Sequence, residues 1–383
     1  MEAHEKSEGG DLMVVATPLR SSWIADRVRA HVPAVSLRDY QADAVHRIAH
    51  AVGHGGKRRV MLVMATGGGK TVVFGALCHV WLADDMGRVL VLAHRDELIS
   101  QAVAKMALWI PRHLIGVVKA EQNTTDTPVV VASVQTARIP RRLEQLGQFS
   151  LIVIDEAHHA AAQSYRDILD GLGAFNSDGP IVVGVTATPK RGDGIGLDDV
   201  FEEIVYRKTY TDLVARGWLV PPKGMAFDLI AREKPQLGID GDYAEGWLGR
   251  MMLKANAPGK ILEAWREHGE NRPTIVFTPT VSVARAVAEA FNEANIPSAW
   301  VSGAMPITER RAALEGLRTQ AIKVVANCAV LTEGFDEPSV SCIVVARPTM
   351  NESLYIQMVG RGTRCIGQTI AESRAAGKHD LLI

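Results

Sequence analysis

A glycine-rich stretch that ends in Lys70 and Thr71 has the residue types needed to bind a nucleoside polyphosphate. It follows the apolar run 60–63 and holds three consecutive glycines at 67–69. Because glycine has no Cβ, the backbone N–H groups of such a turn can curl around phosphate oxygens. Lys70 would reach the β- and γ-phosphates, and Thr71 would hold Mg²⁺ at the start of a helix whose positive end faces the anion. Met64 is a departure, since the usual pattern has glycine or alanine at that position.

Two acidic residues, Asp155 and Glu156, are the partner that such a loop requires. They directly follow the apolar run 150–154. Asp155 would hold the Mg²⁺ that bridges the phosphates, and Glu156 would orient or deprotonate the attacking water. Paired carboxylates are also common at solvated helix starts. Their place behind a buried strand, downstream of a Gly-Lys-Thr loop, favours the catalytic interpretation.

Two arginines near the end of the chain, Arg361 and Arg364, could complete this site. They lie three residues apart in a helix predicted over 353–364, which would put them on one helix face. A solvated basic face is the usual fate of such a pair. The phosphate site, however, has no predicted positive side chain other than Lys70, and arginines from a second domain assist phosphoryl transfer. We therefore expect both to act as arginine fingers.

The pattern of apolar runs predicts the scaffold that must hold these groups. Near-continuous Val, Ile and Leu runs, separated by helical segments, are typical of parallel strands buried on both faces. A first series of predicted strands comprises 60–63, 89–93, 129–132, 150–154 and 181–185. A second series, without a phosphate loop, comprises 273–278, 298–301, 323–327 and 340–346. Ligands of open α/β sheets bind beyond the carboxyl ends of the strands, where the glycine loop and the carboxylates would lie.

The two series predict an α/β protein of two domains, each a mainly parallel sheet with helices on both faces. We expect the first domain over 36–220 and the second over 258–383. A connecting segment over 221–257 would join them, and a flexible lead-in would occupy 1–35.

Composition and charge limit the possible partners. The chain has 383 residues, 47% of them hydrophobic and 22% charged, as in an ordinary globular protein large enough for two domains. Its formal net charge of -1 means that any contact with nucleic acid must come from local patches. Four cysteines without CxxC spacing predict neither a zinc site nor a disulfide framework. No apolar run is long enough to span a membrane, so we expect a cytoplasmic protein with no membrane partner.

Eight short motifs, taken in order, resemble the motif set of superfamily 2 helicases with a DEAH box. The resemblance covers residues 37–364, nearly the whole chain. The motifs are Tyr40-Gln41, Ala65-Thr66-Gly67-Gly68-Gly69-Lys70-Thr71, Ala93-His94-Arg95-Asp96-Glu97-Leu98, Ser133-Val134-Gln135-Thr136, Asp155-Glu156-Ala157-His158, Thr186-Ala187-Thr188, Thr332-Glu333-Gly334-Phe335-Asp336 and Gln357-Met358-Val359-Gly360-Arg361-Gly362-Thr363-Arg364. The family implies two RecA-like domains with ATP in the cleft between them and a nucleic-acid strand lying across both.

The resemblance also implies roles for single residues. ATP and Mg²⁺ would be bound by Gln41, which would read the adenine edge, and by Thr66, Gly67, Gly68, Gly69, Lys70, Thr71, Gly334 and Asp336, with Thr71 and Asp155 at the metal. Catalysis would use Lys70, Asp155, Glu156, Gln357, Arg361 and Arg364. Coupling of the nucleotide site to the strand would use His158, Thr186 and Thr188. The nucleic-acid path would be lined by His94, Arg95, Gln135, Thr136, Thr278 and Gly303, although a lone Thr or Gln at a strand end is more often a helix cap.

Within the family, the Thr-Glu-Gly-Phe-Asp and Thr-Ala-Thr motifs look more like the DNA-directed relatives, namely RadD-like and XPB-like helicases and the motor subunits of restriction enzymes. We therefore expect an ATP-dependent helicase or translocase that acts on DNA in preference to RNA and works as a monomer. One alternative is a motor module of a restriction-type complex, with a nuclease or other accessory protein as partner. Another is an ATP-gated clamp that holds nucleic acid without unwinding it. Since the chain stops as an apolar strand begins at 381, an accessory domain could be missing.

Overall fold

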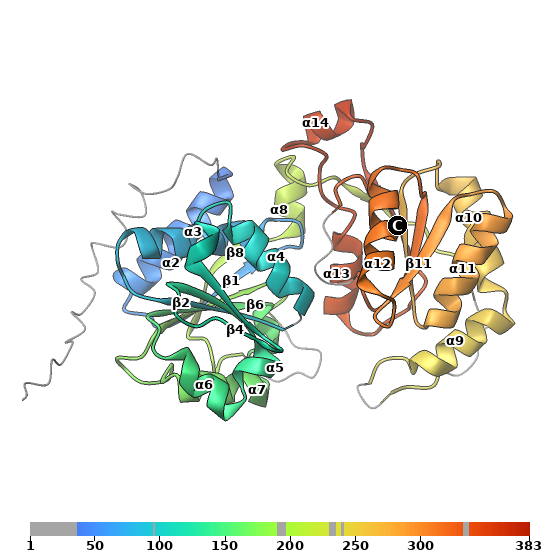
Figure 1. Cartoon of the computed structure of the whole chain (residues 1–383). Helices are drawn as coiled ribbons and strands as arrows, with labels where there is room; N and C mark the ends of the chain where they lie inside the picture. The colour runs from blue at the N-terminus through green and yellow to red at the C-terminus, as the bar shows by residue number, and fades with distance from the viewer. Residues whose placement is uncertain (1–36, 95, 190–196, 230–234, 239–240, 332–336) are drawn as a thin grey trace, which may run out of the picture.

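The computed structural model of the chain describes residues 37–383 apart from 95, 190–196, 230–234, 239–240 and 332–336. Two α/β domains lie side by side, each with helices packed on a mainly parallel sheet (Figure 1). The predicted fold class is confirmed. The predicted lead-in over 1–35 lies outside the described residues.

The first domain contains an eight-stranded sheet in the order β4-β3-β5-β2-β6-β7-β1-β8. Its strands are β1 (Arg59–Met64), β2 (Val89–Ala93), β3 (Ile115–Lys119), β4 (Gln122–Asn123), β5 (Val129–Ser133), β6 (Leu151–Asp155), β7 (Ile181–Thr186) and β8 (Glu203–Lys208). Only the short β4 pairs in antiparallel fashion. All five predicted strands are present, and β3, β4 and β8 are additional.

Helices cover both faces of this sheet because successive strand residues point to opposite sides. Val60 and Leu62 of β1 pack on one face with Phe74, whereas Met61 packs on the other face with Tyr165. The helices are α2 (Asp39–Gly53), α3 (Lys70–Ala83), α4 (Asp96–Met106), α5 (Val134–Ala137), α6 (Pro140–Leu146), α7 (Gln163–Gly171) and α8 (Tyr210–Ala215), with short 3-10 turns η1 (Arg112–Leu114) and η2 (Ala157–His159).

The second domain has a six-stranded sheet in the order β11-β12-β10-β13-β14-β9. Its strands, all paired in parallel, are β9 (Pro222–Lys223), β10 (Thr274–Thr278), β11 (Ser298–Ser302), β12 (Val324–Cys328), β13 (Cys342–Val345) and β14 (Leu381–Leu382). The helices are α9 (Glu245–Lys254), α10 (Ala257–His268), α11 (Val281–Glu293), α12 (Ile307–Arg318), α13 (Glu352–Gly360) and α14 (Ile370–Ala375). None of the helices in the described parts of the chain is both long and apolar enough to cross a lipid bilayer.

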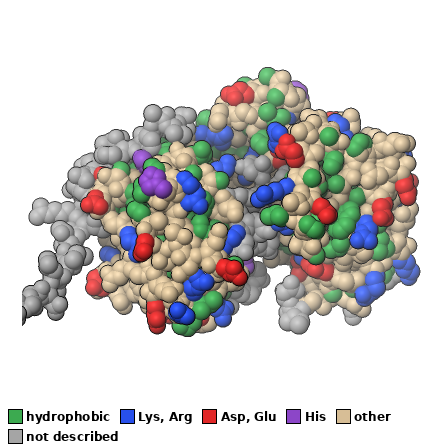
Figure 2. Space-filling model, in the orientation of Figure 1, with side chains coloured by type: hydrophobic (Ala, Val, Ile, Leu, Met, Phe, Trp, Pro, Cys, Tyr) green, Lys and Arg blue, Asp and Glu red, His purple; other side chains and the backbone are tan. Residues whose placement is uncertain are grey.

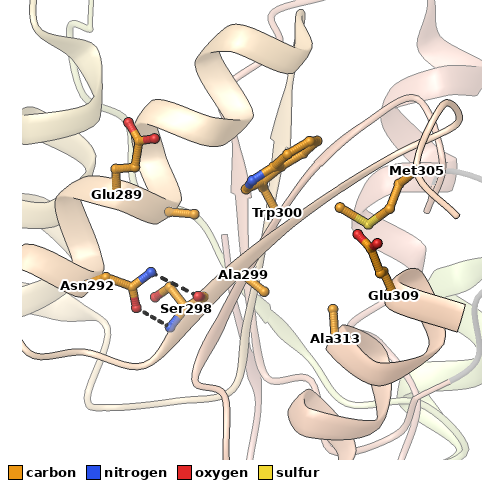
Figure 3. A pocket seen from close by; sticks show the side chains of 9 residues that line it. Glu289, Asn292, Ser298, Ala299, Trp300, Met305, Glu309 and Ala313 are labelled. Carbon is orange, nitrogen blue, oxygen red and sulfur yellow. Dashed lines mark hydrogen bonds between the residues drawn. The ribbon is translucent and has the colours of Figure 1, made fainter.

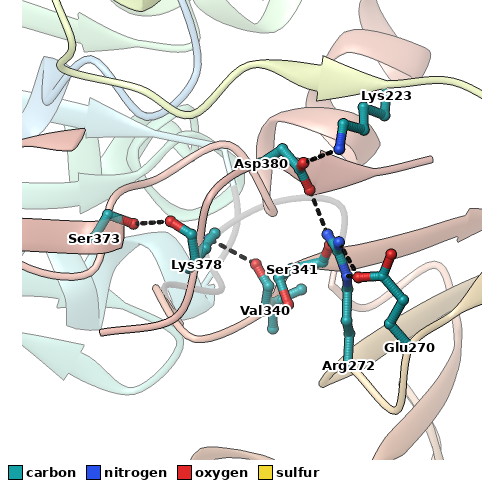
Figure 4. Close-up of polar contacts among 8 residues, drawn as sticks. All are labelled: Lys223, Glu270, Arg272, Val340, Ser341, Ser373, Lys378 and Asp380. Atoms are coloured by element: carbon teal, nitrogen blue, oxygen red, sulfur yellow. Dashed lines mark hydrogen bonds and ion pairs between the residues drawn. The ribbon is translucent and has the colours of Figure 1, made fainter. Parts of the chain in front are cut away.

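The described parts of the segment 221–257, which we expected to be a connection, pack with the second sheet. Its strand β9 pairs with β14, and Leu248 and Met252 of α9 lie in the core beside Phe291. The end of the chain is fixed in the same layer. Asp380 lies 2.5 Å from Lys223 Nζ and 2.5 Å from Arg272 Nη1 (Figure 4). The second sheet therefore draws its outer strands from both ends of the domain.

The helix predicted over 353–364 is too long. α13 ends at Gly360, Arg361 is its C-cap, and Arg364 forms an isolated antiparallel bridge with Leu219. Glycines at 360 and 362 flank Arg361 and disfavour further helix. The two arginines therefore do not share a helix face, and that part of the prediction is wrong.

Candidate active site

The glycine-rich loop joins β1 to α3 at the carboxyl edge of the first sheet. Gly67 and Gly69 have φ values of 85° and 86°, the left-handed region that favours glycine. Gly69 is the N-cap of α3, and among the described residues no side chain caps this helix. The first N–H groups of α3 therefore remain available to an anion, which is the arrangement of a phosphate site.

The position of the Met64 side chain shows why the loop tolerates methionine where the usual pattern has glycine or alanine. The residue is fully buried, and its side chain lies directly beneath Gly68. A Cβ on Gly68 would lie 2.7 Å from Met64 Cγ and 3.1 Å from Leu213 Cδ1. The methionine thus points into the core and supports the loop from below, so it does not intrude on the phosphate-binding side.

Lys70 and Glu156 meet at the centre of the site. Lys70 Nζ lies 3.5 Å from Glu156 Oε1, and both side chains are about nine-tenths buried. Burial alone would raise the pKa of Glu156, but the charges of Lys70, His158 and Arg361 hold this pKa well below its usual range. Glu156 is therefore a carboxylate at neutral pH, the form that a water-orienting residue needs.

The backbone at Glu156 is in an unusual conformation. Its φ is 49° and its ψ is 51°, a left-handed geometry that is costly for a residue with a side chain. The Glu156 N–H donates to Asp155 Oδ1 at 3.0 Å. Asp155 is the last residue of β6, so the strand end presents the two carboxylates in succession.

A chain of polar contacts leads from Glu156 to the second domain. His158 Nδ1 lies 3.4 Å from Glu156 Oε2 and 3.1 Å from Thr186 Oγ1. Thr186 Oγ1 donates to the Thr188 carbonyl at 2.8 Å. Thr188 Oγ1 is 2.7 Å from Ser353 Oγ, at the start of α13. The predicted coupling residues are thus in contact with one another, and Ser353 of the second domain contacts the last of them, Thr188.

α13 lies on the side of the second domain that faces the first (Figure 1). Gln357 and Arg361 are both buried, 6% and 7% exposed. The charge of Arg361 contributes to the low pKa of Glu156, after the larger contributions of Lys70 and His158. Arg364 is positioned differently. It contacts the Gly67 side of the loop, and burial lowers its pKa to about 10.

The loop and the second domain also fit each other closely. A Cβ on Gly67 would lie 3.2 Å from Thr363 Oγ1 of the second domain and 3.0 Å from Cδ2 of Leu219, which packs in the core of the first domain. In return, a Cβ on Gly360 would lie 2.5 Å from Thr66 Cβ. Each domain therefore has a glycine where a threonine side chain of the other domain packs, Gly67 against Thr363 and Gly360 against Thr66.

Tyr40 and Gln41 hold the loop from the other side. The Tyr40 hydroxyl and the Gln41 Nε2 both donate to the Gly68 carbonyl, at 2.9 and 3.1 Å, and Gln41 Oε1 accepts from Arg38 N–H at 3.0 Å. We expected Gln41 to read a base edge. That role stays a prediction; in the structure the Gln41 amide contacts the glycine-rich loop on one side and the start of α2 on the other.

The site fits a nucleotide with its metal. Thr66 Oγ1 and Glu156 Oε2 are buried and form no hydrogen bond within the described residues, although His158 Nδ1 lies 3.4 Å from Glu156 Oε2 as an ion-pair partner. Such orphaned polar atoms are rare unless a ligand or water completes them. Together with the open helix end, they leave Thr71 and Asp155 as the residues that would hold a divalent cation.

The residues predicted to line a nucleic-acid path differ in their exposure and in their hydrogen bonds. Gly303 is exposed and His94 is half-buried, stacked on His159 at 4.8 Å between ring centroids. Gln135 Oε1 accepts from Ser133 Oγ, and Thr136 Oγ1 accepts from Ala120 N–H. Thr278 is 1% exposed and donates to the Asn327 carbonyl, so its hydroxyl faces the interior. Arg95, Gly334 and Asp336 lie outside the described residues.

Sequence reasoning missed Ser353 and the structural role of Tyr40. Ser353 stands four residues before Gln357, so the two share a face of α13. That spacing was visible in the sequence. Its partner Thr188 is 165 residues away, and no local pattern joins them.

Comparison with known families gives two matches along the chain. Residues 34–191 match the family described as "Type III restriction enzyme, res subunit". Residues 254–365 match the "Helicase conserved C-terminal domain". The two matches cover the glycine loop and the arginine segment respectively.

Individual relatives agree with these matches. The chain is 32% identical over 342 residues to a Saccharomyces cerevisiae protein named as an ATP-dependent helicase, IRC3, and 34% identical over 365 residues to its Schizosaccharomyces pombe namesake. These alignments cover 86% and 91% of the chain but only 49% and 57% of the yeast proteins. Among solved structures, an HsdR subunit fragment of a type I restriction enzyme from Vibrio vulnificus superimposes with a TM-score of 0.71 at 23% identity, covering 94% of this chain and 65% of that one.

Proposed function

Because this chain belongs to the superfamily 2 helicases, in the subgroup of restriction-enzyme motors, we propose that it is a nucleic-acid-dependent ATPase that moves along DNA. One observation carries the proposal. Lys70 and Glu156 of the first domain are 3.5 Å apart, and Arg361 of the second domain is close enough to lower the pKa of Glu156. Groups for phosphoryl transfer therefore come from both domains.

In the proposed reaction, ATP is bound by the loop 66–71, with Mg²⁺ held by Thr71 and Asp155. Mg²⁺ held by these two residues would supply neutralisation of the negative charge on the phosphates. Lys70 contacts the transferred phosphate, and Glu156, kept ionised by its neighbours, orients the attacking water. Arg361 stabilises the charge that develops in the transition state.

Movement follows if closure of the two domains depends on the nucleotide. Contacts from Thr188 to Ser353 and from Gly67 to Thr363 exist only while the domains are together. A ligand that contacts both domains favours the closed arrangement, and hydrolysis of that ligand lets the domains separate again. A strand bound across both domains would then be gripped differently in the two states.

DNA is the proposed substrate. Lys and Arg side chains lie on both domains beside their junction (Figure 2), in a protein of nearly zero net charge. Such local patches suit the phosphate backbone, which dominates nucleic-acid affinity and carries no sequence information. We propose a monomeric motor that tracks the backbone and is not sequence-specific.

An ATPase assay with single-stranded DNA, duplex DNA, RNA or no addition tests the proposal. We expect DNA to stimulate phosphate release and Lys70→Ala to abolish it. A Lys254→Ala variant, which changes an exposed lysine of α9, serves as the matched control. Turnover that no nucleic acid stimulates would contradict the motor function, and stimulation by RNA alone would contradict the substrate.

A second candidate is a motor module of a restriction-type complex. It is favoured by the match of residues 34–191 to the family described as "Type III restriction enzyme, res subunit". ATP-driven displacement of a triplex-forming oligonucleotide without separation of DNA strands would support this candidate. Strand separation by the isolated chain would support the helicase.

A further inference from the structure

The strand β11 forms one edge of the second sheet. Among the described strands it pairs with β12 alone, over Ser298 to Ser302. An edge strand exposes backbone N–H and C=O groups that can pair with another chain. The opposite edge is the two-residue β9, which begins with a proline and offers much less.

The side of β11 that faces away from β12 is only partly occupied. Asn292 Nδ2 donates to the Ser298 carbonyl at 3.0 Å, and Ser298 N–H donates to Asn292 Oδ1 at 2.9 Å. Both backbone groups of Ser298 therefore point outward. Since alternate residues of a strand direct these groups to the same side, the N–H and C=O of Trp300 point outward too.

This outward side is the floor of a groove. α11 supplies one wall with Ala288 and Glu289, and the other wall comes from Met305 and from Glu309 and Ala313 of α12 (Figure 3). The groove encloses about 360 Å³. Small alanine side chains on both walls leave room for an extended chain along the open edge.

The charges of the groove specify what would fit. Glu289 and Glu309 are exposed, stand on opposite walls, and form no ion pair with another described residue. The indole of Trp300 already has the Arg285 guanidinium above it, 5.0 Å from the ring centroid. The carboxylates are thus the charges left for a ligand, and they favour basic side chains.

We propose that β11 is the docking edge for an extended basic peptide segment of a partner protein, which adds a further strand through the backbone groups of Trp300. Trp300 packs with the α11 layer and Ala299 with the α12 layer. Successive side chains of the added strand therefore point alternately toward Glu289 and Glu309. Two basic residues at adjacent positions reach both carboxylates, whereas basic residues two apart lie on one face and reach only one.

A second copy of this chain is a poor occupant. The β11 sequence Ser-Ala-Trp-Val-Ser has no basic residue to meet the two carboxylates. Pairing of two β11 edges would place four acidic side chains around one short ribbon, which like-charge repulsion disfavours.

The test uses two short labelled peptides of Thr and Val that contain two lysines, adjacent in one and two residues apart in the other. Fluorescence polarisation with the full chain should show tighter binding of the adjacent isomer by about three- to five-fold, since one exposed ion pair is worth up to about 1 kcal/mol. N-methylation of the central backbone amides should abolish binding, because it removes the strand's donors.

The matched variants carry the same charge change at different places. Glu289→Lys with Glu309→Lys should weaken binding of the adjacent isomer at least about ten-fold. Glu263→Lys with Glu293→Lys, on exposed positions of α10 and α11 outside the groove, should leave it unchanged. Absence of binding, equal affinity for the two isomers, or equal effects of the two double variants would overturn the proposal. The proposal would also be overturned if sedimentation showed a dimer of the chain that Trp300→Pro in β11 dissociates but that the peptide leaves intact.

Discussion

In each domain a central strand leads into a helix, and the two helices differ in how their N-termini are capped. In the first domain, β1 leads through three glycines into α3, whose N-terminus has no side-chain cap among the described residues. In the second, β10 leads through Pro279 into α11, and Thr280 Oγ1 accepts the Val283 N–H at 3.3 Å. The second helix is closed by its own side chain. At this strand-to-helix step the first domain leaves its helix end open to an anion, whereas the second domain closes it with a threonine.

Their buried lysines differ in the same way. Lys70 lies beside the carboxylate of Glu156. Lys378 of the second domain is 3% exposed and donates to the carbonyls of Pro338 and Val340, both at 2.7 Å (Figure 4). One lysine lies in the candidate active site, whereas the other joins the end of the chain to the segment that leads into β13.

The largest expected effect tests whether the second domain contributes to catalysis at all. Arg361→Gln should lower the rate of ATP hydrolysis by about 10³- to 10⁵-fold, because an arginine finger acts mainly on the transition state. Nucleotide affinity, measured with a fluorescent ATP analogue, should change far less. Arg374→Gln in α14 is the control, since it removes an exposed arginine from the same domain. Equal activity of the two variants would mean that the first domain works alone.

The next prediction concerns pH and the buried lysines. Burial lowers the pKa of Lys378 to about 7, whereas an unfolded lysine titrates near 10.5. Between these values the unfolded chain binds a proton that the folded chain has released, so the free energy of unfolding should rise with pH. The slope contributed by one such group is at most about 1.4 kcal/mol per pH unit. Urea titrations at about pH 7 and about pH 9 should show this rise in the wild type.

Lys378→Met should remove that rise, whatever its effect on absolute stability. Lys254→Met, at an exposed position of α9, should retain it. If both variants keep the wild-type pH dependence, Lys378 is not the titrating group.

A smaller effect tests the closed helix end of the second domain. Thr280→Ala should lower the free energy of unfolding by about 1 kcal/mol, because the α11 N–H groups lose their cap. Thr280→Ser should recover most of it. Urea denaturation measures both, and ATPase activity should be kept, since α11 contributes no group to the proposed nucleotide site.

The smallest expected effect concerns the contact that joins the domains. Ser353→Ala removes the 2.7 Å hydrogen bond to Thr188 and should lower DNA-stimulated turnover two- to ten-fold, as expected for about 0.5–1.5 kcal/mol. The rate without DNA should be nearly unchanged, and Ser353→Thr should restore the stimulated rate. A proportional loss in both rates would assign Ser353 a merely structural role.

How much the sequence predicted depended on where the signal was concentrated. The five central strands of the first sheet were found because their Val, Ile and Leu residues are buried on both faces. β8 was missed because it is an edge strand, with Glu203, Arg207 and other residues largely exposed. The phosphate loop and acidic pair are local in sequence and were found for that reason.

The relative placement of the arginines could not be predicted in the same way. Local helical spacing put Arg361 and Arg364 on one face, but α13 ends between Met358 and Gly362, where the chain turns to meet Leu219. That turn is decided by packing against the other domain. The contact of Thr188 with Ser353 is equally non-local, so both required the folded chain.

The interlocking glycines bear on how such proteins can diversify. Thr66 leaves no space for a side chain at 360, and Leu219 with Thr363 leaves little at 67. A substitution at one of these positions changes which residues its counterpart accepts, so the pairs should vary together among descendants of a common ancestor. For the same reason, a chimera that takes its first domain from one family member and its second domain from another should have a poorly fitting domain interface. Matching the interface residues of the two domains should restore the fit.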